Sequence, residues 1–240
     1  MDKEKQVYDM LDKVYDPELD QPLTDLGFID RIVIENDKVE VVFRLPTYWC
    51  SPNFAYIMAE DIHDYVSQLN WVHEVKVNLI DHCNSSEINQ GVNSKRAFSE
   101  SLRSFGGSDA ELDELRKTFQ IKAFYARQEK IIKHLLNKEG LQKEDIVTLS
   151  LEAFYALPLK EEGPVLREKY LEKKLWLDHG GNEAFTTPEG DVLSLETFSE
   201  YLLGLKRTRL SMEFNGHYCR GLLEARYNLP STNEEGAMSR

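Results

Sequence analysis

Cys50 is the residue of this sequence whose position most favours chemistry. It follows an alternating apolar segment, and the next two residues, Ser51 and Pro52, are typical of the N-cap and first position of a helix. A sulfur at that place faces backbone N–H groups without partners inside the helix, which favours the thiolate, the form that attacks electrophiles and binds metals. A lone cysteine is as often a small buried hydrophobe. Spacing alone leaves both interpretations open.

Further groups that can bind a metal lie far apart in the sequence. His82 and Cys83 are adjacent, and His217 and Cys219 are separated by one tyrosine. Folding can bring all four to Cys50, and sulfur and imidazole ligands suit zinc, iron or an iron-sulfur cluster. Because the sequence has no C-x-x-C pair, the alternative is that these are ordinary loop and helix residues.

The segments that must position these residues begin with a small α+β module over residues 1–80. Apolar spacing predicts a helix before Asp16-Pro17 and a second helix over residues 52–69. Alternation predicts strands over residues 28–34, 39–45 and 75–79, the first two joined by a turn. The predicted order is therefore α-β-β-α-β.

The rest of the chain is expected to be mostly α-helical. The apolar period fails over residues 81–107, which we interpret as a linker or a functional loop. A helical domain over residues 108–229 follows, and residues 230–240 are expected to be a disordered tail. Within that domain helices are predicted over residues 108–140, 144–157, 164–180 and 194–227, the last of them with a break.

Composition narrows the classes of function. The 42 acidic and 29 basic residues give a formal net charge of -13, which argues against a nucleic-acid partner. No apolar stretch approaches the roughly 20 residues that span a bilayer. We therefore expect neither a membrane partner nor a secretory signal, and we expect a cytoplasmic location. Three scattered cysteines do not make a disulfide framework. Since no Walker or G-x-G-x-x-G motif is present, no nucleotide cofactor is expected.

The N-terminal motifs resemble those of a known family. Their order is Asp16-Pro17-Glu18-Leu19, Asp25-Leu26-Gly27-Phe28-Ile29, an alternating strand that leads to Thr47 and Cys50, a helix, and residues 72–77. This arrangement, over roughly residues 4–80, resembles the iron-sulfur cluster assembly family long called domain of unknown function 59, which includes the PaaD and SufT proteins. Members usually have proline directly after the cysteine, whereas Ser51 intervenes here.

The resemblance implies an accessory protein for the maturation of metal-sulfur centres. It implies a reactive cysteine at Cys50 and a motif loop containing Asp16, Glu18 and Thr47. Residues 81–89 and the helix containing residues 116–119 are also similar to assembly proteins encoded beside bacterial multicomponent hydrocarbon monooxygenases, which would make the client an oxygenase component.

These observations predict a non-enzymatic maturation factor. Its Cys50 would contact iron, zinc or an iron-sulfur cluster transiently, and its partners would be a client metalloprotein and other assembly factors. One alternative is a stable metal-binding protein or enzyme with a fixed site made of Cys50, His82, Cys83, His217 and Cys219. Another is a folding chaperone or adaptor that does not need its cysteines.

Overall fold

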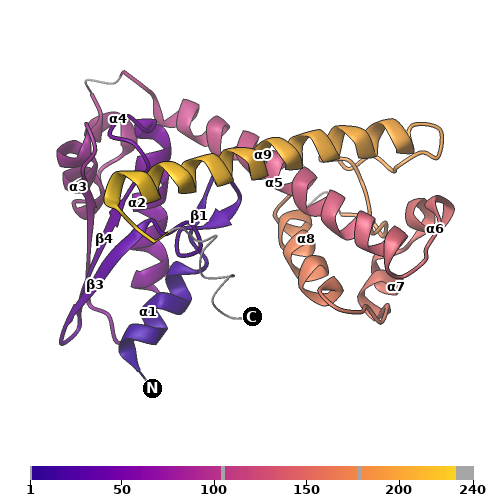
Figure 1. Cartoon of the computed structure of the whole chain (residues 1–240), viewed down its shortest axis with the longest axis horizontal. Helices are drawn as coiled ribbons and strands as arrows, with labels where there is room; N and C mark the ends of the chain where they lie inside the picture. The colour runs from indigo at the N-terminus through magenta and orange to yellow at the C-terminus, as the bar shows by residue number, and fades with distance from the viewer. Residues whose placement is uncertain (1, 104–105, 178–179, 231–240) are drawn as a thin grey trace. The chain divides into compact units, whose positions relative to one another are not determined.

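The computed structural model describes residues 2–103, 106–177 and 180–230 (Figure 1). The chain forms two compact units. The first comprises residues 1–116 together with residues 213–240, and the second comprises residues 117–212. The polypeptide therefore leaves the first unit, builds the second, and returns to the first. The predicted division, with one helical domain over residues 108–229, has other boundaries.

The first unit contains the predicted α-β-β-α-β order, which confirms the α+β class. Strands β3 and β4 are antiparallel, β4 and β5 are parallel, and the sheet order is β3-β4-β5. A short antiparallel hairpin, β1 with β2, precedes them. The elements are α1 (Lys3–Leu11), β1 (Tyr15–Asp16), β2 (Gln21–Pro22), β3 (Ile29–Glu35), β4 (Lys38–Arg44), α2 (Pro52–Ser67) and β5 (Glu74–Ile80).

One face of this sheet forms the core of the first unit. Alternate residues of β5, namely Val75, Val77 and Leu79, are buried and belong to the same apolar cluster as the inward face of α2. Burying one such side chain stabilises a fold by about 1.5–3 kcal/mol. The apolar residues of the strand, which recur every two positions, and those of the helix, which recur about every 3.6, therefore point into the same core.

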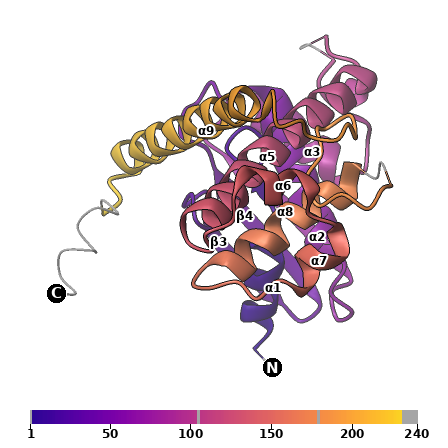
Figure 2. The same cartoon turned by 90° about the vertical axis from the view of Figure 1, so that its right-hand side faces the viewer.

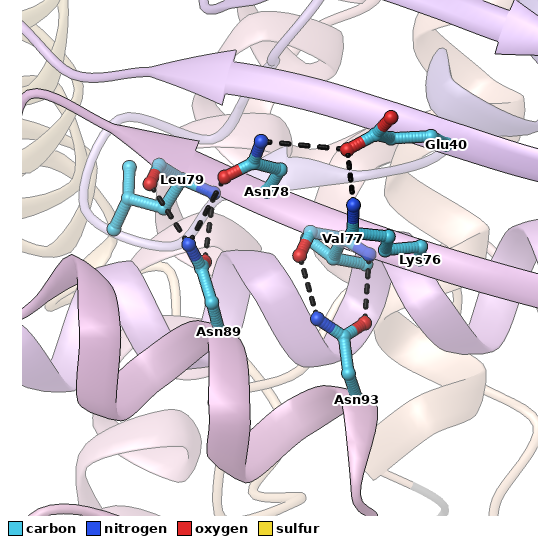
Figure 3. A network of polar contacts seen from close by, with 7 residues as sticks. All are labelled: Glu40, Lys76, Val77, Asn78, Leu79, Asn89 and Asn93. Carbon is cyan, nitrogen blue, oxygen red and sulfur yellow. Dashed lines mark hydrogen bonds and ion pairs between the residues drawn. The ribbon is translucent and has the colours of Figure 1, made fainter.

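The segment expected as a linker or functional loop contains two helices, α3 (Ser85–Asn93) and α4 (Phe98–Ser101). Helix α3 lies along β5, an edge strand of the sheet (Figure 3). The Asn89 amide accepts the N–H of Leu79 at 2.8 Å and donates to its carbonyl at 3.0 Å. Asn93 makes the same pair of bonds with Val77, both at 2.8 Å.

This pairing depends on a match between two periods. Four residues of helix rise about 6 Å, and two residues of strand rise about 6.6 Å. The two asparagines of α3 therefore meet alternate residues of β5 and pair backbone groups that would otherwise attract another strand. Asparagine at these positions also explains why the apolar period fails in this segment.

The second unit is helical. It contains most of α5 (Asp109–Asn137), then α6 (Lys143–Thr148), α7 (Leu151–Ala156), α8 (Gly163–Leu177) and the first half of α9 (Phe198–Tyr227). Its core includes stacked and tilted aromatic rings of Phe124, Phe154, Tyr170 and Phe185.

Two predictions for the helical region differ from the structure in detail. The single helix predicted over residues 144–157 is two helices, because Leu149 is extended and the Ser150 hydroxyl caps α7 by accepting the N–H of Ala153. Helix α9, in contrast, is continuous (Figure 2). Residues 231–240 of the expected tail lie outside the described residues. Within the described ranges, none of the helices is both long and apolar enough to cross a bilayer.

Candidate functional site

Cys50 lies in the loop between β4 and α2 and is half-buried. Its sulfur is 3.3 Å from the hydroxyl oxygen of Thr47. That oxygen also accepts the backbone N–H of Trp49 at 3.2 Å, which leaves the hydroxyl hydrogen able to point at the sulfur. Helix α2 begins at Pro52, as predicted, although the Ser51 side chain makes no capping bond. Thr47 therefore positions the sulfur from within the same loop.

His82 and Cys83 hold the Cys50 loop from the end of β5. The Nδ1 atom of His82 accepts the N–H of Asn84 at 3.1 Å, so its Nε2–H donates to the Cys50 carbonyl at 2.8 Å. Burial lowers the pKa of His82, and the bond to that carbonyl only partly opposes this effect. The backbone N–H of Cys83 donates to the carbonyl of Tyr48 at 3.0 Å. Both residues thus act on the loop's backbone.

The thiol of Cys83 has a partner of its own. Its sulfur donates to the side-chain oxygen of Asn84 at 3.2 Å. Since both ring nitrogens of His82 are also bonded, this pair of residues serves to support the Cys50 loop in the observed geometry.

The acidic turn Asp16-Pro17-Glu18 forms the tip of the β1–β2 hairpin. The Asp16 carboxylate is 7% exposed and accepts the backbone N–H groups of Glu18 at 2.9 Å and Leu19 at 3.0 Å. Burial raises the pKa of Asp16 to about 7, with a further contribution from the Glu18 charge, and outweighs the two N–H bonds that lower it. Near neutral pH this carboxyl group is therefore present in both protonation states.

The C-terminal half of α9 packs on this hairpin. Gly216 faces Gln21 so closely that a Cβ there would lie 2.5 Å from the Gln21 amide nitrogen. One turn later, Arg220 donates to the Gln21 amide oxygen at 3.1 Å. Leu223 is buried, and its side chain lies where a Cβ on Gly27 would touch it. Residues at helical spacing therefore form one contact face.

The end of α9 is bound to the strands on either side of the Cys50 loop. Arg226 donates to the carbonyls of Leu45 at 3.1 Å and Asp81 at 2.7 Å. The Tyr227 hydroxyl donates to the Asp81 carboxylate at 3.1 Å, and the Arg44 guanidinium lies 4.4 Å from the Tyr227 ring centroid. These contacts fix the helix over the ends of β4 and β5.

Cys219 lies on the same face of α9, between Gly216 and Leu223, and is half-buried. Like Cys50, it packs against the core cluster of the first unit. Burial, with smaller contributions from the charges of Asp16, Cys50 and Glu18, raises the pKa of Cys219 to about 11. The two sulfurs and the acidic turn thus lie within electrostatic reach of one another.

His217 lies apart from this group. It is exposed, and two residues along a helix turn the side chain by about 200° away from Cys219. In residues 2–103, 106–177 and 180–230, no three His, Cys, Asp or Glu side chains are arranged to hold a metal ion. Of the five expected ligands, Cys50 and Cys219 pack against one core cluster, His82 and Cys83 bond to the backbone of the Cys50 loop, and His217 lies on another side of α9.

Sequence reasoning missed the residues by which α9 is attached, among them Gly216, Arg220 and Arg226. A signal was present for part of this attachment, because Gly216, Arg220 and Leu223 recur at spacings of four and three along the helix, on one face. Sequence reasoning also gave no role to the exposed aromatic pair that precedes Cys50. Tyr48 and Trp49 are 46% and 77% exposed, with ring centroids 4.9 Å apart in an edge-to-face arrangement.

Comparison with known protein families gives a match for the N-terminal part of the chain. Residues 4–78 match a family model described as iron-sulfur cluster assembly protein, which is 75 of the 240 residues. The matched segment runs from α1 into β5 and contains the acidic turn, Thr47 and Cys50. A search of curated proteins found none that matches the chain. The family resemblance predicted from the motifs is confirmed, and α9 with Cys219 lies beyond the matched residues.

Proposed function

We propose that this chain, which carries an iron-sulfur cluster assembly domain over residues 4–78, is an accessory factor for the maturation of a metal-sulfur centre in a client protein. The supporting observation is the state of Cys50. Its backbone is bound by His82 on one side, while its half-buried sulfur is bonded to the Thr47 hydroxyl. A sulfur on a fixed loop that is partly open to solvent suits the temporary binding of a soft metal.

In this proposal iron, zinc or an iron-sulfur cluster is the cargo of the protein. The chain's own contribution is to orient the Cys50 sulfur and to stabilise its charge. The Thr47 hydroxyl donates to the thiolate once the proton has left, which is a charge-assisted bond. Because such a cargo takes four ligands, a site that fills only some of them leaves positions for ligands of the client.

A fixed Cys/His centre receives less support. Both ring nitrogens of His82 are engaged, and the Cys83 thiol is bonded to Asn84. Building the five-ligand site would require breaking these bonds and turning His217 to the other side of its helix. The geometry therefore favours a transfer role.

We place the client's docking surface at Tyr48 and Trp49, directly before Cys50. Aromatic residues provide much of the binding energy at protein interfaces, and Trp49 leaves most of its ring in solvent. The client we propose is a component of a multicomponent monooxygenase, on the strength of the resemblance of residues 81–89 and 116–119 to proteins encoded beside such enzymes. Other assembly factors would supply the iron and sulfide.

Co-expression with the client tests this function. Cys50→Ala should lower the iron and acid-labile sulfide content of the purified client by about tenfold or more, because the contact atom is removed. Cys83→Ala is the matched control, since its sulfur is bonded to Asn84, and it should leave the content unchanged. Trp49→Ala should weaken client binding without changing the fold. Full loading of the client with the Cys50 variant would overturn the proposal, and retained client binding in that case would point to a cysteine-independent adaptor.

A further inference from the structure

We propose that α9 supplies a second sulfur, that of Cys219, to the Cys50 site, and that the two thiols together bind a thiophilic divalent metal. The inference rests on the proposed function, since it takes Cys50 to be the cargo contact. It goes beyond the assembly domain because Cys219 lies outside the matched residues 4–78.

The position of Cys219 is fixed from both sides along the helix. Before it, Gly216 allows the backbone of α9 to approach Gln21, and after it, Leu223 is buried against the first unit. The helix end is bonded to Leu45 and Asp81 through Arg226. A residue three positions after Gly216 and four before Leu223 must therefore face the same surface.

The contacts of α9 bring this face toward the Cys50 loop. Arg226 bonds to the carbonyl of Asp81, which is next to the His82 that bonds to the Cys50 carbonyl, and both cysteines pack against the core cluster of the first unit. The electrostatic interaction of Cys50 with Cys219 agrees with this placement. Asp16 and Glu18 act on Cys219 as well. Negative charge within electrostatic reach of the sulfur attracts a divalent cation and repels an anion.

Metal binding at this pair balances without any redox partner. Two S–H bonds break, two sulfur–metal bonds form, and two protons leave to solvent, while the metal stays divalent. Two sulfur ligands fill half of a tetrahedral site. The remaining positions are open to water, or to ligands of the client when the metal is transferred.

The direct test titrates cadmium into the reduced full-length protein and follows the thiolate-to-metal absorbance. Wild type, Cys50→Ser, Cys219→Ser and the control Cys83→Ser are compared. Either site variant should lose about half of the absorbance and bind cadmium at least about tenfold more weakly, whereas Cys83→Ser should match wild type. Wild-type binding by Cys219→Ser would overturn the inference.

A second measurement needs no change at Cys219. Dibromobimane fluoresces only after it has alkylated two neighbouring thiols, with loss of two bromide ions. The folded Cys83→Ser protein should become fluorescent, and peptide mass spectrometry should find the bridge between Cys50 and Cys219. Two separately alkylated cysteines would refute the pairing even if Cys219→Ser proved unstable.

The client assay separates the two proposals. If Cys219→Ser loads the client normally and binds cadmium as wild type does, while Cys50→Ala does not load it, the second sulfur is refuted and the maturation role stands. If Cys50→Ala loads the client fully, the maturation role is refuted, whatever the cadmium titration shows.

Discussion

The buried carboxyl of Asp16 should make the stability of the first unit depend on pH, and Asp16→Asn should remove that dependence. The asparagine oxygen can still accept the N–H groups of Glu18 and Leu19, so the turn is kept and only the charge is lost. The titratable groups that interact with Asp16 are Glu18 in its own turn and Cys219 on α9.

The sign of this pH dependence follows from the direction in which folding shifts the pKa of Asp16. The pKa of Asp16 rises from 3.8 to about 7 on folding, so the folded state binds more protons between these values. The stabilising effect of the protonated group is fully present below about pH 4 and is lost as the pH rises through about 7. A difference of about 3 pKa units corresponds to at most about 4 kcal/mol. Between about pH 5 and pH 8 the expected change is about 3 kcal/mol.

Urea unfolding of the full chain, followed by a signal from the first unit, measures this quantity at both pH values. The stability of Asp16→Asn relative to wild type should increase by about 3 kcal/mol from about pH 5 to pH 8. The exposed Asp25 lies nearby, and Asp25→Asn serves as the control that should show no such trend. Parallel pH profiles for wild type and Asp16→Asn would refute the reasoning.

Two further predictions concern the contacts of α3 and α9. Asn93→Ala should destabilise the first unit by about 1–3 kcal/mol and speed hydrogen exchange in β5, because the backbone N–H and C=O of the buried Val77 lose their partner. Gln90→Ala, at an exposed position of the same helix, is the control, and equal exchange rates in the two variants would contradict the role of the Asn93 amide. Gly216→Leu should lift α9 from the β1–β2 hairpin and increase the rate at which Cys219 reacts with a thiol reagent. Gly221→Leu, on an open side of the same helix, should leave that rate unchanged. Equal rates in the two variants would show that the close approach of Gly216 to Gln21 does not position Cys219.

The order of elements in residues 1–80 was predictable because each element has a local period. The strands alternate and the helices repeat every three to four residues, and those patterns can be read without knowing the partner. Helix α3 was not predictable in this way. Its two asparagines, Asn89 and Asn93, bond to the edge of β5, and this tertiary contact leaves no periodic pattern in the sequence.

The candidate site divides along the same line. The positions of Cys50 and the acidic turn were readable from the family-like motifs, and the model match over residues 4–78 confirms the family resemblance. The approach of α9 was not, because Gln21 and Arg220 are 199 residues apart in the sequence. His217 and Cys219 looked equivalent as ligands until a helix placed them on different sides.

The return of the chain to its first unit also determines when that unit can be completed during synthesis. Residues 4–78 emerge from the ribosome early, but Cys219 follows 141 residues later. At about 5–20 residues per second, the delay is roughly 7 to 30 seconds. During that interval Cys50 has been synthesised but α9 has not, so a nascent or truncated chain has the Cys50 loop without the helix that packs beside it. In the proposed site, both thiols can therefore meet a metal only after Cys219 has been synthesised.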